Sequence, residues 1–149
     1  MKRFEIKTKM ENHLMRNGEK KTSEKLLLQS LKELQKTSSK QTKNLIKLAL
    51  TQTTPIFKLQ KIENKKQRKK NRKIKEIPFF VLNYKTRFSL AIKFLLKVIK
   101  KKKAKNFYTK LNQEILLNVK SEGEATVIKN NLQKQVLLNK RYFYFYKWR

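Results

Sequence analysis

The sequence contains no cysteine and no aspartate, and its only histidine is His13. Without cysteine, disulfides, thiolate metal ligands and a cysteine nucleophile are all excluded. One histidine and no aspartate also exclude a Ser-His-Asp triad and most metal-ligand sets. His13 stands beside the apolar Leu14, and we expect it to be structural or merely exposed. The sequence therefore predicts a protein that is not an enzyme and has no catalytic residues, no metal site and no cofactor.

Long apolar runs are also missing, because lysines interrupt every apolar stretch before it reaches the 18 or so residues of a spanning helix. The first residues, "MKRFEIKTKMENH", include two glutamates and no apolar segment. We therefore expect neither a secretory signal nor a transit peptide. Lysine outnumbers arginine 33 to 7, and Asn, Ile, Leu and Phe are plentiful. This usage indicates an AT-rich coding genome, such as that of an organelle or an AT-rich bacterium.

Acidic residues are scarce: 10 stand against 40 Lys and Arg, which gives a net charge of +30 in 149 residues. A chain this basic favours a polyanion, and above all a nucleic acid, as its partner. Its apolar fraction is 38%, and a chain of this length can bury about 70% of the surface that it exposes unfolded. We expect a single domain, 1–149, that repels itself electrostatically and gains stability when phosphates neutralise it.

Apolar residues recur at helical spacing in most of the chain. Asn17-Gly18 should end the first helix, and Thr22 is expected to cap the second, whose apolar stripe is Leu27, Leu31 and Leu34. Asn106 should cap a later helix, and Ser121 with Glu124 has the spacing of a capping box. The helices are expected at 4–16, 22–36, from about 42 to 53, 87–101, 106–119 and 121–140.

Between the third and fourth helices the period changes. "PIFKL" and "IKEIPFFVL" have the aromatic and β-branched content of strands, and they bracket a very polar, basic stretch. Pro78 within the second strand indicates an edge position. The expected fold is mainly α: a bundle of five to six helices with one long basic β-hairpin inserted after the third helix. The hairpin should span 55–82 and the helical body 1–54 and 83–149.

Several strings occur in an order that is characteristic of one family. They are "NHLMRNGEKKTSEK", "LALTQTTPIFKL" around Pro55, "EIPFFV" around Pro78, "SLAIKFLLKVIK" and the final "YKW". From about residue 9 onward, this order and spacing resemble the small-subunit ribosomal protein S7 family, in particular its organelle-type members. The string "SLAIKFLLKVIK" is similar to the Leu-Ala-x-Arg-Trp helix of that family, with Lys93 at the position of the Arg and Phe94 at the position of the Trp.

The resemblance implies a structural protein that binds small-subunit ribosomal RNA in the head (the 3′ major domain) and nucleates head assembly. It implies neighbouring head and platform proteins as partners and a hairpin near the exit-site tRNA and the messenger path. No membrane is implied. We expect this protein to be encoded in the organelle and to lie in the ribosomes of the mitochondrial matrix. A plastid and the cytoplasm of an AT-rich bacterium are the alternatives.

Basic residues at the Asn-Gly turn, in the hairpin and on the helical body are the predicted contacts with RNA phosphates. The segment 61–75 alone carries nine Lys and Arg against one Glu. RNA contact by Lys100–Lys103 and Lys105, at a helix end, is left open, as is base stacking by the aromatic tail. The candidate RNA-binding residues are Lys20, Lys21, Lys65, Lys66, Arg68, Lys69, Lys70, Arg72, Lys73, Lys75, Lys85, Arg87, Lys93, Lys140, Arg141 and Lys147.

Two other classes of function fit the composition. A non-ribosomal nucleic-acid chaperone or compacting protein would have the same charge but would need no ordered series of elements. A membrane-surface binder could use the basic amphipathic helix at 88–102.

Overall fold

The computed structural model describes residues 6–38, 41–63, 74–103 and 106–145. Within them lie six α-helices and one antiparallel two-stranded hairpin that follows the third helix, which confirms the predicted fold class. The elements are α1 (Ile6–Leu14), α2 (Lys20–Thr37), α3 (Thr42–Thr53), β1 (Phe57–Glu63), β2 (Ile74–Phe80), α4 (Tyr84–Lys101), α5 (Phe107–Val119), α6 (Glu124–Leu138) and the 3₁₀ helix η2 (Lys140–Phe145).

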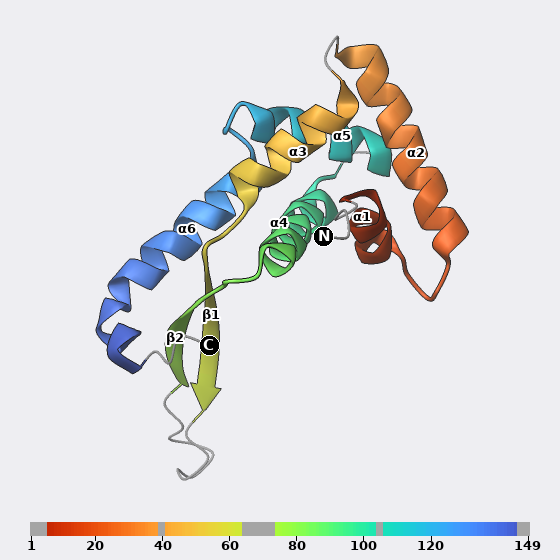
Figure 1. The fold of residues 1–149 in the computed structure, drawn as a ribbon. Helices are drawn as coiled ribbons and strands as arrows, with labels where there is room; N and C mark the ends of the chain where they lie inside the picture. Colours follow the sequence, from red (N-terminus) through yellow and green to blue (C-terminus); the bar gives the residue numbers. More distant parts are fainter. Residues whose placement is uncertain (1–5, 39–40, 64–73, 104–105, 146–149) are drawn as a thin grey trace.

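Helix α4 lies at the centre of the bundle and packs against α1, α3, α5 and α6. In Figure 1, α1 and α2 lie on one side of it and α6 on the other, while the hairpin leaves the body at the lower side. The α1–α2 turn lies on that same lower side of the view.

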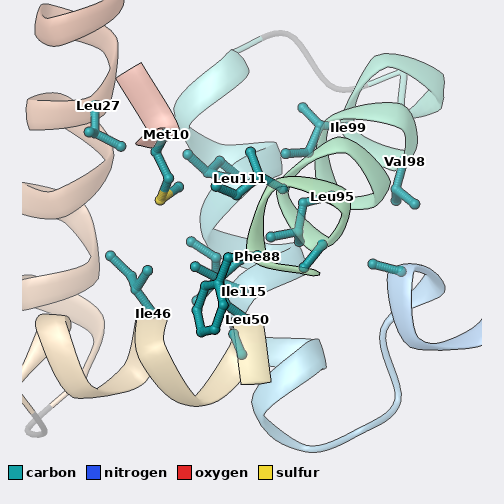
Figure 2. Packing of buried hydrophobic residues seen from close by; sticks show 14 of the residues in the cluster. Met10, Leu27, Ile46, Leu50, Phe88, Leu95, Val98, Ile99, Leu111 and Ile115 are labelled. Carbon is teal, nitrogen blue, oxygen red and sulfur yellow. The ribbon is translucent and has the colours of Figure 1, made fainter. Parts of the chain in front are cut away.

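The hydrophobic core gathers around α4 because its buried residues follow helical spacing (Figure 2). Facing residues come from α1, α2, α3, α5 and α6, so one cluster joins elements on both sides of the hairpin in sequence. The buried members include Met10, Leu27, Leu34, Ile46, Leu50, Phe88, Ala91, Ile92, Leu95, Val98, Ile99, Leu111, Ile115 and Ala125.

The buried face of α2 differs from the predicted leucine stripe. Leu27 and Leu34 are buried as expected, but Leu31 is only partly buried, and Ser23 and Ser30 complete the face. Each serine hydroxyl donates to a carbonyl of its own helix, that of Lys20 or of Leu27. Because these hydroxyls are satisfied locally, the two small side chains can be buried.

The predicted cap of α2 is wrong. Asn17 and Gly18 have positive φ (50° and 80°), as expected of a left-handed turn, and the chain re-enters a helix at once, at Lys20. Glu19 takes the N-cap position. Thr22 instead lies inside the first turn and donates its hydroxyl hydrogen back to the Glu19 carbonyl at 2.7 Å.

Helix α4 begins three residues before the predicted start. The Asn83 side chain caps it, since its Oδ1 accepts a hydrogen bond from the Lys85 amide at 3.0 Å. Asn106 does hold the N-cap position of α5, but its side chain donates to the Tyr108 hydroxyl instead of accepting from the backbone. The last helix, α6, ends at Leu138, and a 3₁₀ helix replaces its expected final residues.

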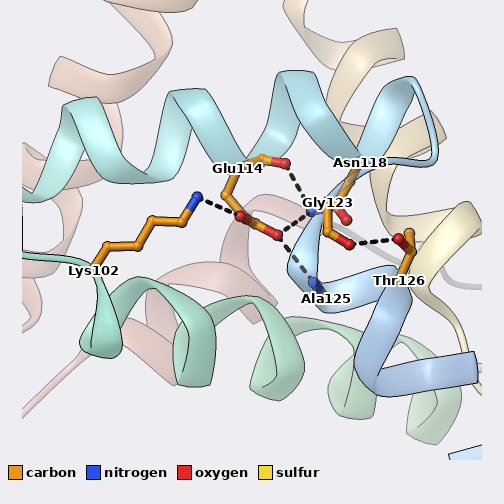
Figure 3. Close-up of polar contacts among 6 residues, drawn as sticks. All are labelled: Lys102, Glu114, Asn118, Gly123, Ala125 and Thr126. Carbon is orange, nitrogen blue, oxygen red and sulfur yellow. Dashed lines mark hydrogen bonds and ion pairs between the residues drawn. The ribbon is translucent and has the colours of Figure 1, made fainter. Parts of the chain in front are cut away.

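The predicted capping box of α6 is also wrong, and a buried carboxylate replaces it (Figure 3). Ser121 has a φ of 64°, and Gly123 is the N-cap residue. The amide of Ala125 donates to Oε1 of Glu114, a residue of α5, at 3.0 Å. Glu114 is fully buried, and its Oε2 accepts from Lys102 at 2.7 Å. One carboxylate from the middle of α5 therefore joins the end of α4 to the start of α6.

The two strands of the hairpin pair in register from Phe57 opposite Phe80 to Glu63 opposite Ile74. Pro78 lies opposite Leu59. Since the sheet in the described residues has two strands, each strand has an open edge, and the edge position predicted for Pro78 is confirmed.

Replacement of a core leucine tests the packing of α5. Leu111→Ala should lower the free energy of unfolding by about 2–5 kcal/mol, because a buried side chain leaves a cavity. Leu117→Ala on the same helix is the control, since Leu117 is 37% exposed and should cost below about 1 kcal/mol. Urea unfolding followed by circular dichroism measures both, and equal losses would contradict the observed helix orientation.

The tight α5–α6 junction gives a second test. A Cβ added at Gly123 would lie 2.2 Å from Oδ1 of Asn118, so Gly123→Ala should destabilise the protein by about 1–3 kcal/mol. Ser121→Gly, two residues earlier, should leave stability unchanged or higher, because glycine adopts positive φ without a Cβ clash. Thermal unfolding of both variants decides whether close packing or backbone conformation governs this turn.

Candidate nucleic-acid interface

The described acidic side chains mostly take part in contacts within the protein. Lys7 bridges Glu11 and Glu24 at 3.6 and 3.7 Å, which links α1 to α2. Glu33 of α2 accepts from Asn112 of α5. With Glu114 buried against Lys102, few carboxylates are left to neutralise the exposed lysines. The outer surface is therefore strongly positive.

The corner between α1 and α2 carries Lys20 and Lys21, both exposed. Neither ammonium group forms a hydrogen bond or ion pair with the residues that the structure describes. Both lie in the first turn of α2, where the positive end of the helix dipole also favours an anion. The corner predicted from the Asn-Gly turn is thus present, with two cations at its tip.

A second group of basic residues lies at the seam between α1 and α4. His13 of α1 is half-buried, and its Nε2 is 2.5 Å from Oγ of Ser89 of α4, in agreement with the structural role expected for this histidine. Burial lowers the pKa of His13 below its usual value, and the charges of Lys93 and Lys9 lower it further. Lys93, one of the predicted RNA contacts, is exposed beside this pair.

Arg87 lies at the base of the hairpin, where it is half-buried. Its Nε donates to the Val81 carbonyl at 2.6 Å, and its guanidinium carbon is 5.2 Å from the centre of the Phe80 ring. Phe57 packs against both Phe80 and Phe143, with ring centres 5.7 and 5.8 Å apart. Arg87 therefore holds the hairpin against α4, a structural role that its sequence position did not indicate.

The other predicted residues are distributed as follows. Lys85 is exposed in the first turn of α4, and Lys140 and Arg141 are exposed in η2, with Arg141 4.9 Å from the Tyr142 ring centre. The backbone of Lys75 lies in β2, opposite Ile62. Outside the described residues lie Lys65, Lys66, Arg68, Lys69, Lys70, Arg72, Lys73 and Lys147.

The structure separates the members of the lysine cluster at the end of α4. Lys102 is turned to the buried Glu114, whereas Lys100, Lys101 and Lys103 are exposed; Lys105 lies outside the described residues. In the aromatic tail, Phe143 packs on Phe57, which favours packing over base stacking for this ring.

Sequence reasoning predicted Lys21 but missed the row of lysines that continues from it on the outer face of α2. Lys21, Lys25, Lys32 and Lys36 are all exposed, and their spacing of 4, 7 and 4 places them on one side of the helix. This periodicity was available as a signal, since it runs opposite the buried stripe.

Within the described ranges, no group of three or more His, Cys, Asp or Glu side chains is arranged so that it could hold a metal ion. In the same part of the chain, none of the helices combines the length and the hydropathy that crossing a membrane requires.

Comparison with known proteins agrees with this arrangement. The sequence profile of the family described as "Ribosomal protein S7p/S5e" matches residues 2–140. "Small ribosomal subunit protein uS7" of the bacterium Wigglesworthia glossinidia brevipalpis is 28% identical over 144 residues, which cover 97% of this chain and 87% of that protein. The uS7m protein of Reclinomonas americana is 26% identical, with 92% and 81% covered. The uS7c protein of Pleurastrum terricola is 25% identical, with 90% and 82% covered.

The profile match covers nearly the whole chain, and the helices, the hairpin position and the outward-facing cations suit an RNA-bound particle. The chain therefore belongs to the ribosomal protein S7 family and is a structural, non-enzymatic protein of the small ribosomal subunit.

Proposed function

We propose that this protein binds the ribosomal RNA of the small-subunit head, in the 3′ major domain, and nucleates assembly of the head. The observation that carries the proposal is the division of charges: carboxylates join helices to one another, while lysines of α1, α2 and α4 face outward. A surface of this kind can neutralise phosphates of several RNA segments at once. No covalent step is involved.

Lysine contacts supply affinity more than base specificity. An ammonium group is a point charge without the planar fork that arginine presents to phosphates and guanines, so the exposed lysines can bind backbone phosphates of any sequence. Selectivity must then come from the shape of the RNA, which has to place its phosphates where the rigid helical body places its cations.

Binding should also stabilise the protein. The net charge of +30 opposes the compact state, and counterion-like neutralisation by phosphates removes that opposition. We infer that the chain acts as one body, with the hairpin at 55–82 extending from it toward the exit-site tRNA and the messenger path. The aromatic contacts of Phe57, Phe80 and Phe143 support a fixed hairpin base.

Neighbouring head and platform proteins are further proposed partners. Leu137 and Leu138 at the end of α6 are 66% and 81% exposed, and exposed large apolar side chains suit protein contact better than phosphate contact. We place the protein in a mitochondrial ribosome; the mitochondrial relative and the lysine-rich usage support this, although plastid and bacterial relatives match as well.

The first test of this proposal compares two RNAs. Affinity for a fragment of the small-subunit head should fall steeply with salt, because lysines displace counterions, and should exceed affinity for tRNA of equal length at about physiological ionic strength. Filter binding over a salt series measures both. Equal affinities would favour a general nucleic-acid chaperone.

The second test separates hairpin from body. A hairpin variant with Lys66, Arg68, Lys69, Lys70 and Arg72 replaced by Ser should still enter small subunits but should alter exit-site tRNA retention or reading-frame fidelity. A body variant with Lys20, Lys21, Lys85 and Lys93 replaced by Ser should enter particles poorly. Arg87 is left intact in both, since its contacts hold the hairpin base.

Co-sedimentation with small subunits measures incorporation, and circular dichroism confirms that both variants fold. If the hairpin variant fails to enter particles while the body variant enters normally, the hairpin is the anchor and the proposed division is wrong.

A further inference from the structure

The seam between α1 and α4 brings together side chains that are far apart in sequence. The contact between His13 and Ser89 joins two helices across 76 positions. Lys9 precedes His13 by one helical turn, and Lys93 follows Ser89 by one turn. Residues four apart lie on the same face of a helix. The contact between His13 and Ser89 therefore places the lysine of each helix near the same imidazole and hydroxyl.

The surroundings of His13 are positive on the side of this cluster. Helix α1 packs against α2 and α4. On the α2 side, Lys7 holds Glu11 and Glu24 in ion pairs. The charges that do lower its pKa are those of Lys93 and Lys9. The cluster thus has two cations, Lys9 and Lys93, beside the imidazole.

An unfavourable arrangement of this kind suits an anion. Two neighbouring ammonium groups repel each other and disfavour the imidazolium form, and one phosphate between them would reverse both effects. One hydrogen of the neutral imidazole and the Ser89 hydroxyl lies in the bond between them, and the other can be donated to a phosphate oxygen. Lys93 is exposed and Lys9 half-buried, so the cluster is open to an RNA backbone.

We propose that Lys9, His13, Ser89 and Lys93 form a binding site for one phosphodiester of the RNA, in which His13 takes up a proton as the phosphate binds. This inference rests on the proposed function, since RNA supplies the phosphodiester. The phosphodiester is a monoanion throughout the range in which histidine titrates, so the proton goes to the imidazole. Both ring nitrogens of His13 then carry a hydrogen that they can donate.

The site should make RNA binding depend on pH. Bound phosphate raises the pKa of His13 relative to the free protein, so the complex holds more protons than its separate components between the two pKa values. By linkage, affinity must then rise as pH falls through this range and level off below both values. We expect a gain of roughly three- to tenfold between about pH 7.5 and 5.5.

Because His13 is the only histidine, its Cε1–H proton gives a single resonance in the NMR spectrum of the full chain. Titration of that resonance should show a pKa higher by about one unit or more in the complex with a head RNA fragment than in the free protein. Lys93→Gln should reduce this rise. Lys97→Gln, one turn further along α4 and also exposed, is the charge-matched control and should leave it unchanged.

Affinity measurements use the same RNA at both pH values. The wild-type chain should show the gain at low pH, and the affinity of His13→Gln should be the same at both pH values; circular dichroism verifies its fold. Inorganic phosphate serves as a separate probe. If phosphate alone raises the pKa of His13 and RNA does not, the site takes free phosphate and the assignment to RNA is wrong.

The remaining outcomes separate this site from the proposed function. Tight, salt-dependent RNA binding with an unchanged His13 pKa overturns the site and leaves the proposed function standing. Absence of RNA binding at low salt overturns both. Equal effects of Lys93→Gln and Lys97→Gln would mean that the general field of the protein, not a built site, shifts the histidine.

Discussion

Repulsion among like charges is the constraint on which the rest of this structure depends. Forty cationic and ten acidic side chains share 149 residues, so a compact fold is possible only if the few carboxylates lie where they stabilise it most. Glu114 is the clearest case, because its two oxygens accept from the end of α4 and from the start of α6. A buried carboxylate is tolerated when its partners are charged or fixed. Glu114 has one partner of each kind, the charged Lys102 and the backbone amide of Ala125.

The same constraint explains why the hairpin is attached by aromatic groups. Ion pairs at its base would compete with phosphates for the lysines and would weaken with salt. The contacts among Phe57, Phe80 and Phe143, and the stacking of Arg87 on Phe80, are largely independent of salt. The base of the hairpin is therefore held by aromatic contacts, which are separate from the exposed lysines through which RNA binding is proposed.

The sequence predicted the elements well because their signals are local. Helical spacing identified the helices, and the aromatic and β-branched segments from Pro55 onward identified the hairpin. At α6 the error arose because a distant residue replaces a local one: Glu114 caps this helix from ten positions before its first helical residue, in place of Ser121 and Glu124. Lysines show the same limit. Lys102 and Lys103 are neighbours of identical chemistry, and only the packing of α5 turns one toward Glu114 and leaves the other exposed.

The proposed contact of lysines with phosphates would also account for the low sequence identity between this chain and its relatives. The chain is 28, 26 and 25% identical to relatives from a bacterium, a mitochondrion and a plastid, yet nearly all of it aligns. A lysine reaches a phosphate from several backbone positions, because its stem is long and its charge has no preferred direction. Individual cations can therefore shift along a helix face without loss of RNA affinity, whereas the core spacing and the helix junctions cannot. At the site proposed for the α1–α4 seam that freedom would end, because displacement of Lys9 or Lys93 would leave the His13–Ser89 pair without a lysine beside it to bind the same phosphate.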